Sequence, residues 1–192
     1  MQPTINNDFS ATKNQFDVVI INKTQNIKRK DIVIIDFSPY HVDDELIIKR
    51  VIAVAGDSIK IVWNLEKNKA DVYLKQKGEQ EFCLLDEPYT QNNEHNIPPK
   101  NHCAQSFLEG STSGKYNSYK WNGYVLNDDG SITIQDGYFF AMGDNREMSL
   151  DSSEVGPFRV EHVIGVTETI EHNGSFANKL IRKIFNLGLN KA

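Results

Sequence analysis

The chain has 192 residues, of which 39% are hydrophobic and 24% charged, and its formal net charge at pH 7 is -5. This length suits one substantial domain, or a core with an appended subdomain. The acidic balance argues against nucleic-acid binding, which requires a basic surface, and the sequence contains neither a signal peptide nor a run of about eighteen apolar residues.

Short β-branched runs dominate the first third of the chain and predict strands. They are FDVVIIN (16–22), DIVIIDF (31–37), LIIKRVIAV (46–54) and DSIKIVW (57–63). Because Gly56 marks a turn between the last two runs, residues 46–63 are predicted to form a hairpin. A second hairpin is predicted around Asp128, Asp129 and Gly130, followed by a strand from Tyr138. No amphipathic helix is predicted before residue 175.

The middle of the chain is rich in Asn, Ser, Pro and Gly, and most of residues 85–123 is expected to be loop. The predicted fold is mainly β, with a regular β core, an irregular inserted subdomain and a short C-terminal helix. We expect residues 1–61 and 137–170 to form the core, residues 62–136 the insert, and residues 171–192 a basic amphipathic tail.

The tail carries apolar residues at helical spacing with basic residues around them. The apolar positions are Leu180, Ile181, Ile184, Phe185 and Leu187, and the basic ones are Lys179, Arg182, Lys183 and Lys191. Two interpretations stay open: residues 177–191 lie on an anionic membrane surface, or they dock as a terminal helix on their own domain.

Neither a metal site nor a cofactor is predicted. His95, His102 and Cys103 lie close in sequence, but no CxxC or HxxxH spacing supports metal binding. Cys83 and Cys103 are too few for a disulfide framework, and the sequence leaves open whether they form one bridge or stay reduced.

Lys49 is the first candidate for chemistry. In an extended strand it shares a face with Ile47 and Val51, so it is expected to be at least partly buried. Burial without a counter-charge lowers the pKa of a lysine, which then acts as a general base near neutral pH. The alternative is that Lys49 lies at a strand edge and extends its ammonium group to water.

The second candidate is GDNREMSLDSSEVGPF, residues 143–158, which follows a predicted strand. Gly-Asp-Asn is typical of turns, because Asp and Asn side chains bond to nearby backbone. The stretch is dense in short polar groups, with Ser149 and Asp151 pointing the same way if the chain is extended. Considered alone, it is equally consistent with a solvated loop.

Together, IIKRVIAVAGDSI and GYFFAMGDNREMSLDSSEVGPFRVEHVIG resemble the two most diagnostic motifs of the bacterial type I signal peptidases, the Ser-Lys leader peptidases of peptidase family S26. The family pattern is roughly KRVIGLPGD and then GDNRxxSxDSRxxGxV. Residues 84–90, LLDEPYT, are similar to the E-P-Y segment that the family often carries between them. The resemblance covers about residues 1–167.

This resemblance implies a signal-peptidase-like catalytic β core and a membrane-anchored serine endopeptidase that removes signal peptides from exported preproteins on the extracytoplasmic side of the cell membrane. The family nucleophile is the serine of S-M-x-P-T. Met1, Gln2 and Pro3 match the substrate-binding part of that motif, so the serine is expected immediately before Met1. The membrane anchor is likewise expected upstream, and the chain as given is expected to be inactive. Lys49 matches the general base.

The remaining matches are supporting residues. Ser149 matches the serine that hydrogen-bonds the lysine, and Asp144, Arg146 and Asp151 match positions that hold the active-site loop together. Ser153 replaces the usual arginine of D-S-R, which leaves Arg146 as the nearest candidate partner for Asp151. The turn before Asp57 also departs from the family pattern, as VIAVAGD in place of VIGLPGD.

Two other functions are compatible with parts of the sequence. The first is a non-catalytic paralogue that binds exported chains or a partner. The second is a self-cleaving repressor domain, which shares the Ser-Lys chemistry but requires a DNA-binding helix-turn-helix and lacks the GDNRxxSxDS string.

Overall fold

The computed structural model describes residues 4–5, 17–23, 26–40, 46–64, 66, 69–90, 122–146, 149–172, 175–177 and 179–181. These residues form mainly antiparallel β-structure, arranged as a six-stranded and a five-stranded sheet. The predicted fold class is therefore confirmed. The division into domains at residues 61, 136 and 170 stays a prediction.

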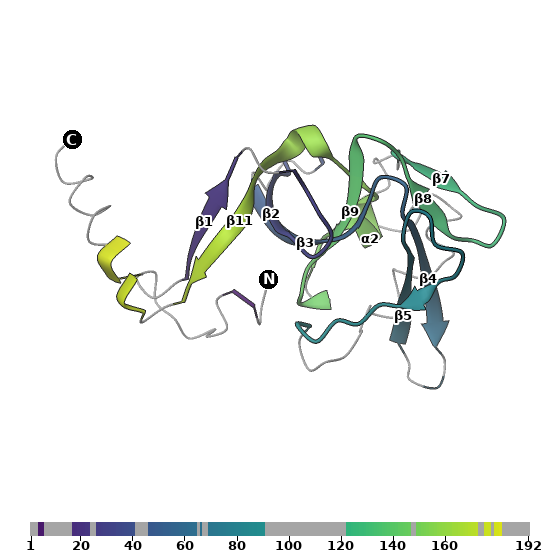
Figure 1. Cartoon of the computed structure of the whole chain (residues 1–192), viewed down its shortest axis with the longest axis horizontal. Helices are drawn as coiled ribbons and strands as arrows, with labels where there is room; N and C mark the ends of the chain where they lie inside the picture. The colour runs from purple at the N-terminus through teal and green to yellow at the C-terminus, as the bar shows by residue number, and fades with distance from the viewer. Residues whose placement is uncertain are drawn as a thin grey trace.

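The first sheet has the strand order β1-β11-β2-β3-β9-β10, and every neighbouring pair is antiparallel. Its strands are β1 (Val18–Asn22), β2 (Ile32–Asp36), β3 (Leu46–Val54), β9 (Tyr138–Met142), β10 (Phe158–Arg159) and β11 (Val163–Glu171). In Figure 1, β1 and β11 extend away from the rest of the sheet as a two-stranded ribbon that leads toward the C-terminal helical turn.

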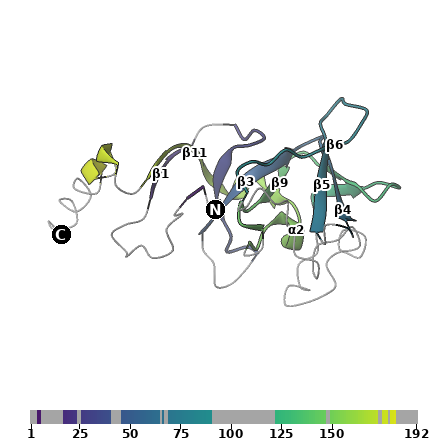
Figure 2. The ribbon, with the colours of Figure 1, turned by 90° about the horizontal axis from the view of Figure 1, so that it is seen from below.

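The second sheet has the order β6-β5-β4-β8-β7 and lies at the opposite end of the molecule from the C-terminal helical turn (Figures 1 and 2). Its strands are β4 (Ser58–Asn64), β5 (Lys69–Lys75), β6 (Cys83–Leu84), β7 (Tyr124–Leu126) and β8 (Ile132–Ile134). The antiparallel β7–β8 pair confirms the hairpin predicted around Asp128–Gly130. The described part of the predicted insert is more regular than expected, because β5 and β6 extend the sheet.

The predicted hairpin over residues 46–63 is wrong. Strand β3 pairs with β2 and β9, whereas β4 pairs with β5 and β8, so the chain changes sheets at the turn between them. Gly56 in this turn has φ +89°, a conformation that favours glycine. The buried Asp57 carboxylate holds the turn by accepting hydrogen bonds from the Val54 amide (3.0 Å) and Arg29 Nη1 (2.8 Å).

Strand β3 contributes to both hydrophobic cores. One cluster contains Ile52 and Ala53 with residues of β4, β5, β8 and β9. The other contains Val51 with residues of β2, β9, α2 (Ser152–Val155) and β11. Consequently residues 49–53 of β3 are buried on both faces, and any polar side chain among them has to find its partners inside the protein.

Helical structure is scarce in the described residues. Before residue 175 it comprises the one-turn helix α2, the 3₁₀ turn η3 (Val160–His162) and Arg146, which has 3₁₀ conformation. Helix α2 and turn η3 are too short to be amphipathic. Residues 176–177 and 179–181 are helical, and most of the predicted tail lies outside the described residues. No helix in the described part of the chain is long and apolar enough to span a membrane.

Candidate active site

Lys49 lies near the middle of β3, opposite Val33 of β2, with only 8% of its surface exposed. The strand has neighbours on both sides, so the alternative of a lysine at a sheet edge does not apply. The predicted burial of Lys49 is confirmed. A buried ammonium group is costly unless it is compensated, and burial of this kind is common where lysines act chemically.

Arg50, the next residue, points to the other face of β3 and forms a two-bond ion pair with Asp144. Arg50 Nε donates to Asp144 Oδ1 at 2.9 Å and Nη2 donates to Oδ2 at 2.7 Å, and both residues are buried. Thr4 completes the network, because its hydroxyl group donates to Asp144 Oδ2 and accepts from Arg50 Nη2. Three distant segments of the sequence therefore meet at one carboxylate.

Gly143 and Ser149 pack against each other directly after β9. Met142 pairs with Arg50, so the antiparallel register brings Gly143 beside the preceding residue of β3, Lys49. A Cβ atom added to Gly143 would overlap Oγ and Cβ of Ser149. The Ser149 hydroxyl group is buried and has no hydrogen-bond partner among the described residues. Such a group is uncommon and indicates a place where a partner is expected.

Asp151 organises the loop that follows. It caps helix α2: Oδ1 accepts from the amide and the hydroxyl of Ser153 (3.0 and 2.7 Å), and Oδ2 accepts from the Gly143 amide (2.9 Å). Ser153, which replaces the usual arginine, is thus itself a partner of Asp151. The expected pairing of Asp151 with Arg146 is wrong, because Arg146 forms its ion pair with a different carboxylate.

That carboxylate is Glu87, which accepts a hydrogen bond from Arg146 Nη2. Arg146 Nε also donates to the Gly143 carbonyl at 3.0 Å. Burial disfavours the charged guanidinium, but the adjacent Glu87 carboxylate outweighs this effect and raises the pKa of Arg146 above its ordinary value. Glu87 and Arg146 are 59 positions apart, so this pair ties the segment after β6 to the loop after β9.

Comparison with known proteins agrees with this arrangement. The sequence profile described as "Signal peptidase, peptidase S26" matches residues 1–171, most of the chain. The chain belongs to the signal peptidase family, peptidase S26. Because the match includes both motifs that contact each other through Arg50 and Asp144, the predicted resemblance to type I signal peptidases is confirmed.

One characterised relative is similar over most of its length. Signal peptidase I V of Bacillus subtilis (strain 168) is 27% identical over 172 residues, which are 89% of this chain and 80% of the relative. A crystal structure of a signal peptidase I from Enterococcus faecalis V583 is 21% identical and aligns over 74% of this chain and 97% of that one, with a TM-score of 0.41. Members of the family are serine proteases.

Sequence reasoning missed two side chains of this candidate site. Glu87 binds Arg146, and the Tyr89 ring lies 4.0 Å from the guanidinium carbon of Arg50. Both belong to the E-P-Y segment, whose similarity to the family was visible but gave no indication of what it contacts. Met1, Gln2 and Pro3, predicted to bind substrate, lie outside the described residues, as do His95, His102 and Cys103.

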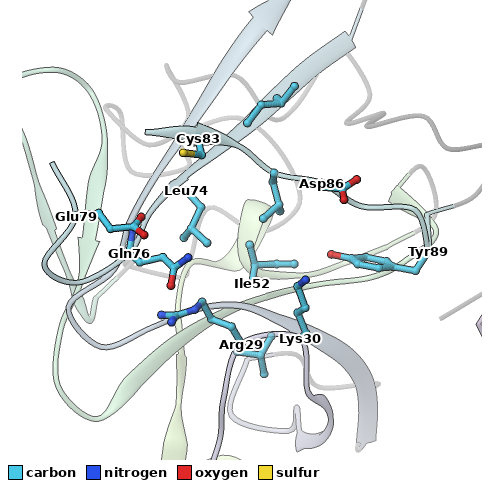
Figure 3. Close-up of a pocket in the computed structure, with 12 residues that line it drawn as sticks. Arg29, Lys30, Ile52, Leu74, Gln76, Glu79, Cys83, Asp86 and Tyr89 are labelled. Atoms are coloured by element: carbon cyan, nitrogen blue, oxygen red, sulfur yellow. The ribbon is translucent and has the colours of Figure 1, made fainter. Parts of the chain in front are cut away.

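A pocket of about 390 Å³ opens beside the site and shares Tyr89 with it. Figure 3 shows the Tyr89 ring directed toward this pocket. Ile52 and Lys30, which also line the pocket, face the hydroxyl end of the ring. Cys83, an exposed free thiol, lies on its far side. The pocket is not lined by any of the predicted catalytic or supporting residues, which are Lys49, Asp144, Arg146, Ser149 and Asp151.

Proposed function

We propose that this chain is the catalytic part of a signal peptidase I that removes N-terminal signal peptides from exported preproteins with a Ser-Lys dyad. Lys49 is the general base, and the nucleophile is a serine immediately before Met1. The observation that carries the proposal is the network of Thr4, Asp144 and Arg50. The network joins the M-x-P-T segment to both family motifs. Its Arg50 is the residue that follows the buried Lys49.

This network limits where the preceding residues reach. An extended chain spans at most about 3.3–3.6 Å per residue, so a residue four positions before Thr4 lies within about 14 Å of it. Thr4 is hydrogen-bonded to the neighbour of Lys49 in β3. This limit is compatible with a serine at that upstream position meeting the Lys49 side chain.

The chemistry follows from a neutral lysine. Lys49 Nζ accepts the proton of the serine hydroxyl group while the serine oxygen bonds to the carbonyl carbon of the scissile peptide. The resulting ammonium group returns the proton to the departing amine, and the signal peptide is left as an acyl ester. Water then attacks the ester with Lys49 again accepting a proton, which releases the carboxylate and restores the serine.

The supporting residues keep this lysine in place. Ser149 is the hydrogen-bond partner of Lys49 in the proposed enzyme, a role supported by its buried hydroxyl group beside Gly143. Asp144, Arg146 and Asp151 hold the surrounding loop through their buried bonds to Arg50, Glu87 and the Gly143 amide.

A non-catalytic paralogue that binds exported chains is the second candidate. The retained Lys49 disfavours it, because a paralogue that does not cleave has no need of the family's general base at this buried position. The DNA sequence upstream of Met1 separates the two: an in-frame serine codon preceded by about twenty apolar codons supports the enzyme, and a different residue at that position contradicts it.

We place the protein at the cell membrane, with the catalytic part on the extracytoplasmic side and an anchor upstream of Met1. The tail is a further lipid contact in this proposal, supported by Phe176 and Leu180, which lie four positions apart and are 83% and 48% exposed. Flotation with anionic vesicles tests the tail. The contact is supported if Phe176→Asp weakens binding to the vesicles. It is contradicted if the original chain and the Phe176→Asp variant bind equally.

The enzyme itself is tested by cleavage of a purified preprotein by the protein extended upstream to include the serine. The expected products are one signal peptide and one mature chain, cut after a small residue and identified by mass spectrometry. The 192-residue chain, without the serine, is expected to leave the preprotein intact. An extended protein that carries the serine and cuts no preprotein contradicts the proposal.

A further inference from the structure

One short segment, residues 86–90, contacts the arginines of both family motifs. Its Glu87 carboxylate binds Arg146 of the loop after β9, and its Tyr89 ring lies 4.0 Å from the guanidinium carbon of Arg50 in β3. The two arginines belong to motifs that are far apart in the sequence. The 86–90 segment is therefore a bridge between them, on the side of the second sheet.

The bridge is held together internally. The Tyr89 hydroxyl group donates to Glu87 Oε1 at 2.8 Å, the same oxygen that Arg146 contacts. The Thr90 amide and hydroxyl donate to the Glu87 carbonyl at 3.1 and 2.9 Å, which closes a turn. At its start the segment is tied to the second sheet, because the Leu85 amide donates to the Val72 carbonyl of β5 at 2.9 Å.

Charge and burial make this bridge hard to replace. Glu87 is 1% exposed and Arg146 6% exposed, so neither charge is stabilised by bulk water. Burial raises the pKa of the Tyr89 hydroxyl, helped by the adjacent Glu87 carboxylate, so the hydroxyl keeps its proton and stays a donor. Charge-assisted hydrogen bonds in such surroundings are strong and directional, and they fix the position of the groups that they join.

The bridge acts on the reacting groups through Gly143. Arg146 Nε donates to the Gly143 carbonyl at 3.0 Å, and Gly143 packs directly on Ser149. Tyr89 acts on the other motif through Arg50, the residue that follows Lys49 and pairs with Asp144. A displacement of the 86–90 segment thus moves both the loop that carries Ser149 and the guanidinium beside Lys49.

We propose that Glu87 and Tyr89 are positioning residues for the cleavage reaction: they hold Ser149 and Lys49 in register with each other from the second sheet. The inference rests on the proposed function. It predicts that the rate of the chemical step, and not the binding of the signal peptide, depends on the 86–90 segment.

The first arm of the test is kinetic and uses the extended protein that carries the serine. Glu87→Gln keeps the shape of the side chain and removes its charge. We expect kcat for preprotein cleavage to fall at least tenfold per folded molecule, with KM changed less than twofold. The control is Glu161→Gln, which removes the same charge from an exposed ion pair with Arg159 and should leave both constants unchanged.

The second arm needs no activity and uses the 192-residue chain. The Gly143 amide donates to Asp151 and reports the order of the loop, and the Val51 amide donates to the Asp31 carbonyl in the core. We expect Glu87→Gln to speed hydrogen exchange at Gly143 at least tenfold more than at Val51, and Glu161→Gln to change neither. Tyr89→Phe is a milder variant and should change exchange at Gly143 in the same direction by a smaller factor. If Glu87→Gln does not fold, the exchange rates of Tyr89→Phe test the inference instead.

The two arms separate the failure of this inference from that of the proposed function. If the unsubstituted extended protein cuts no preprotein, the proposed function fails, and exchange at Gly143 still decides whether the 86–90 segment positions the loop. Equal exchange changes at Gly143 and Val51 in the folded variants overturn the inference. A Glu87→Gln enzyme with unchanged kcat, or one altered only in KM, also overturns it.

Discussion

Arg50 and Asp144 are 94 positions apart in the sequence and form a buried two-bond ion pair, with Nε–Oδ1 and Nη2–Oδ2 distances of 2.9 and 2.7 Å. The pair joins the strand that carries Lys49 to the loop that carries Ser149. Arginine suits this place because its planar guanidinium group binds both carboxylate oxygens at once, which an ammonium group cannot do.

Asp144→Asn is therefore expected to destabilise the fold, because it leaves the Arg50 charge buried without its counter-charge. Loss of one partner of a buried ion pair typically costs about 3–5 kcal/mol, and the free energy of urea-induced unfolding measures it. Arg50→Lys keeps a charge and should cost less. The matched control is Asp129→Asn, whose pair with Lys60 is exposed. Equal stability of the Asp144 and Asp129 variants contradicts the structural role of the pair.

Asp151→Ala is expected to lower stability by about 2–4 kcal/mol. The substitution removes the cap of α2, worth about 1 kcal/mol, and leaves the buried Gly143 amide without its acceptor, at about 1–3 kcal/mol. Thermal unfolding monitored by circular dichroism tests this expectation. The exposed Asp136→Ala serves as control, and an Asp151→Ala protein as stable as that control refutes the capping role.

Gly143→Ala should impair the site more than the fold. The added Cβ overlaps Oγ and Cβ of Ser149, so Ser149 or the loop has to move away from β3. We expect cleavage by the extended protein to fall at least tenfold while circular dichroism is preserved. Gly130→Ala tests the specificity of the effect: nothing lies within 4 Å of its added Cβ, and only the strain of its φ of +77° remains. Full activity of Gly143→Ala would mean that Ser149 is not needed where it lies.

The Tyr89 hydroxyl group should make stability depend on alkaline pH. Burial, aided by the Glu87 carboxylate, raises the pKa of Tyr89 in the folded chain above the ordinary value of about 10. The folded chain then keeps a proton that the unfolded chain loses, so the contribution of Tyr89 is complete below about pH 10 and declines as the pH rises further. Tyr89→Phe removes this contribution, and its unfolding free energy should fall less steeply above pH 10 than that of the original chain. Parallel pH curves would contradict the assignment.

Local patterns predicted the features of the fold that depend on neighbouring residues. The apolar neighbours of Lys49 indicated its burial, and Asp128–Gly130 indicated the turn of the β7–β8 hairpin. Local patterns do not determine which strands pair with each other. Gly56 marks a turn in either case, and only packing against β2 and β9 decides that β3 does not pair with β4.

The candidate site shows the same division. The sequence motifs pointed to Lys49, Asp144 and Ser149 as candidates, but not to the pairing of Glu87 with Arg146, because residues 59 positions apart carry no local signal of contact. Asp151 was expected to need Arg146 in place of the usual arginine. The residue that replaces the arginine as partner of Asp151 is Ser153, two positions further along the chain. Its hydroxyl group donates a hydrogen bond to Asp151 Oδ1 at 2.7 Å.

The role of Lys49 as general base is tested by the single-turnover rate of preprotein cleavage by the extended protein with Lys49→Ala. We expect loss of cleavage by at least about a thousandfold, within the range that general base and nucleophile activation supply, in a protein whose circular dichroism is unchanged. Lys60→Ala, a lysine of strand β4 paired with Asp129 at the surface, should cleave at the original rate. Cleavage by Lys49→Ala at a rate near that of Lys60→Ala would show that Lys49 is not the general base.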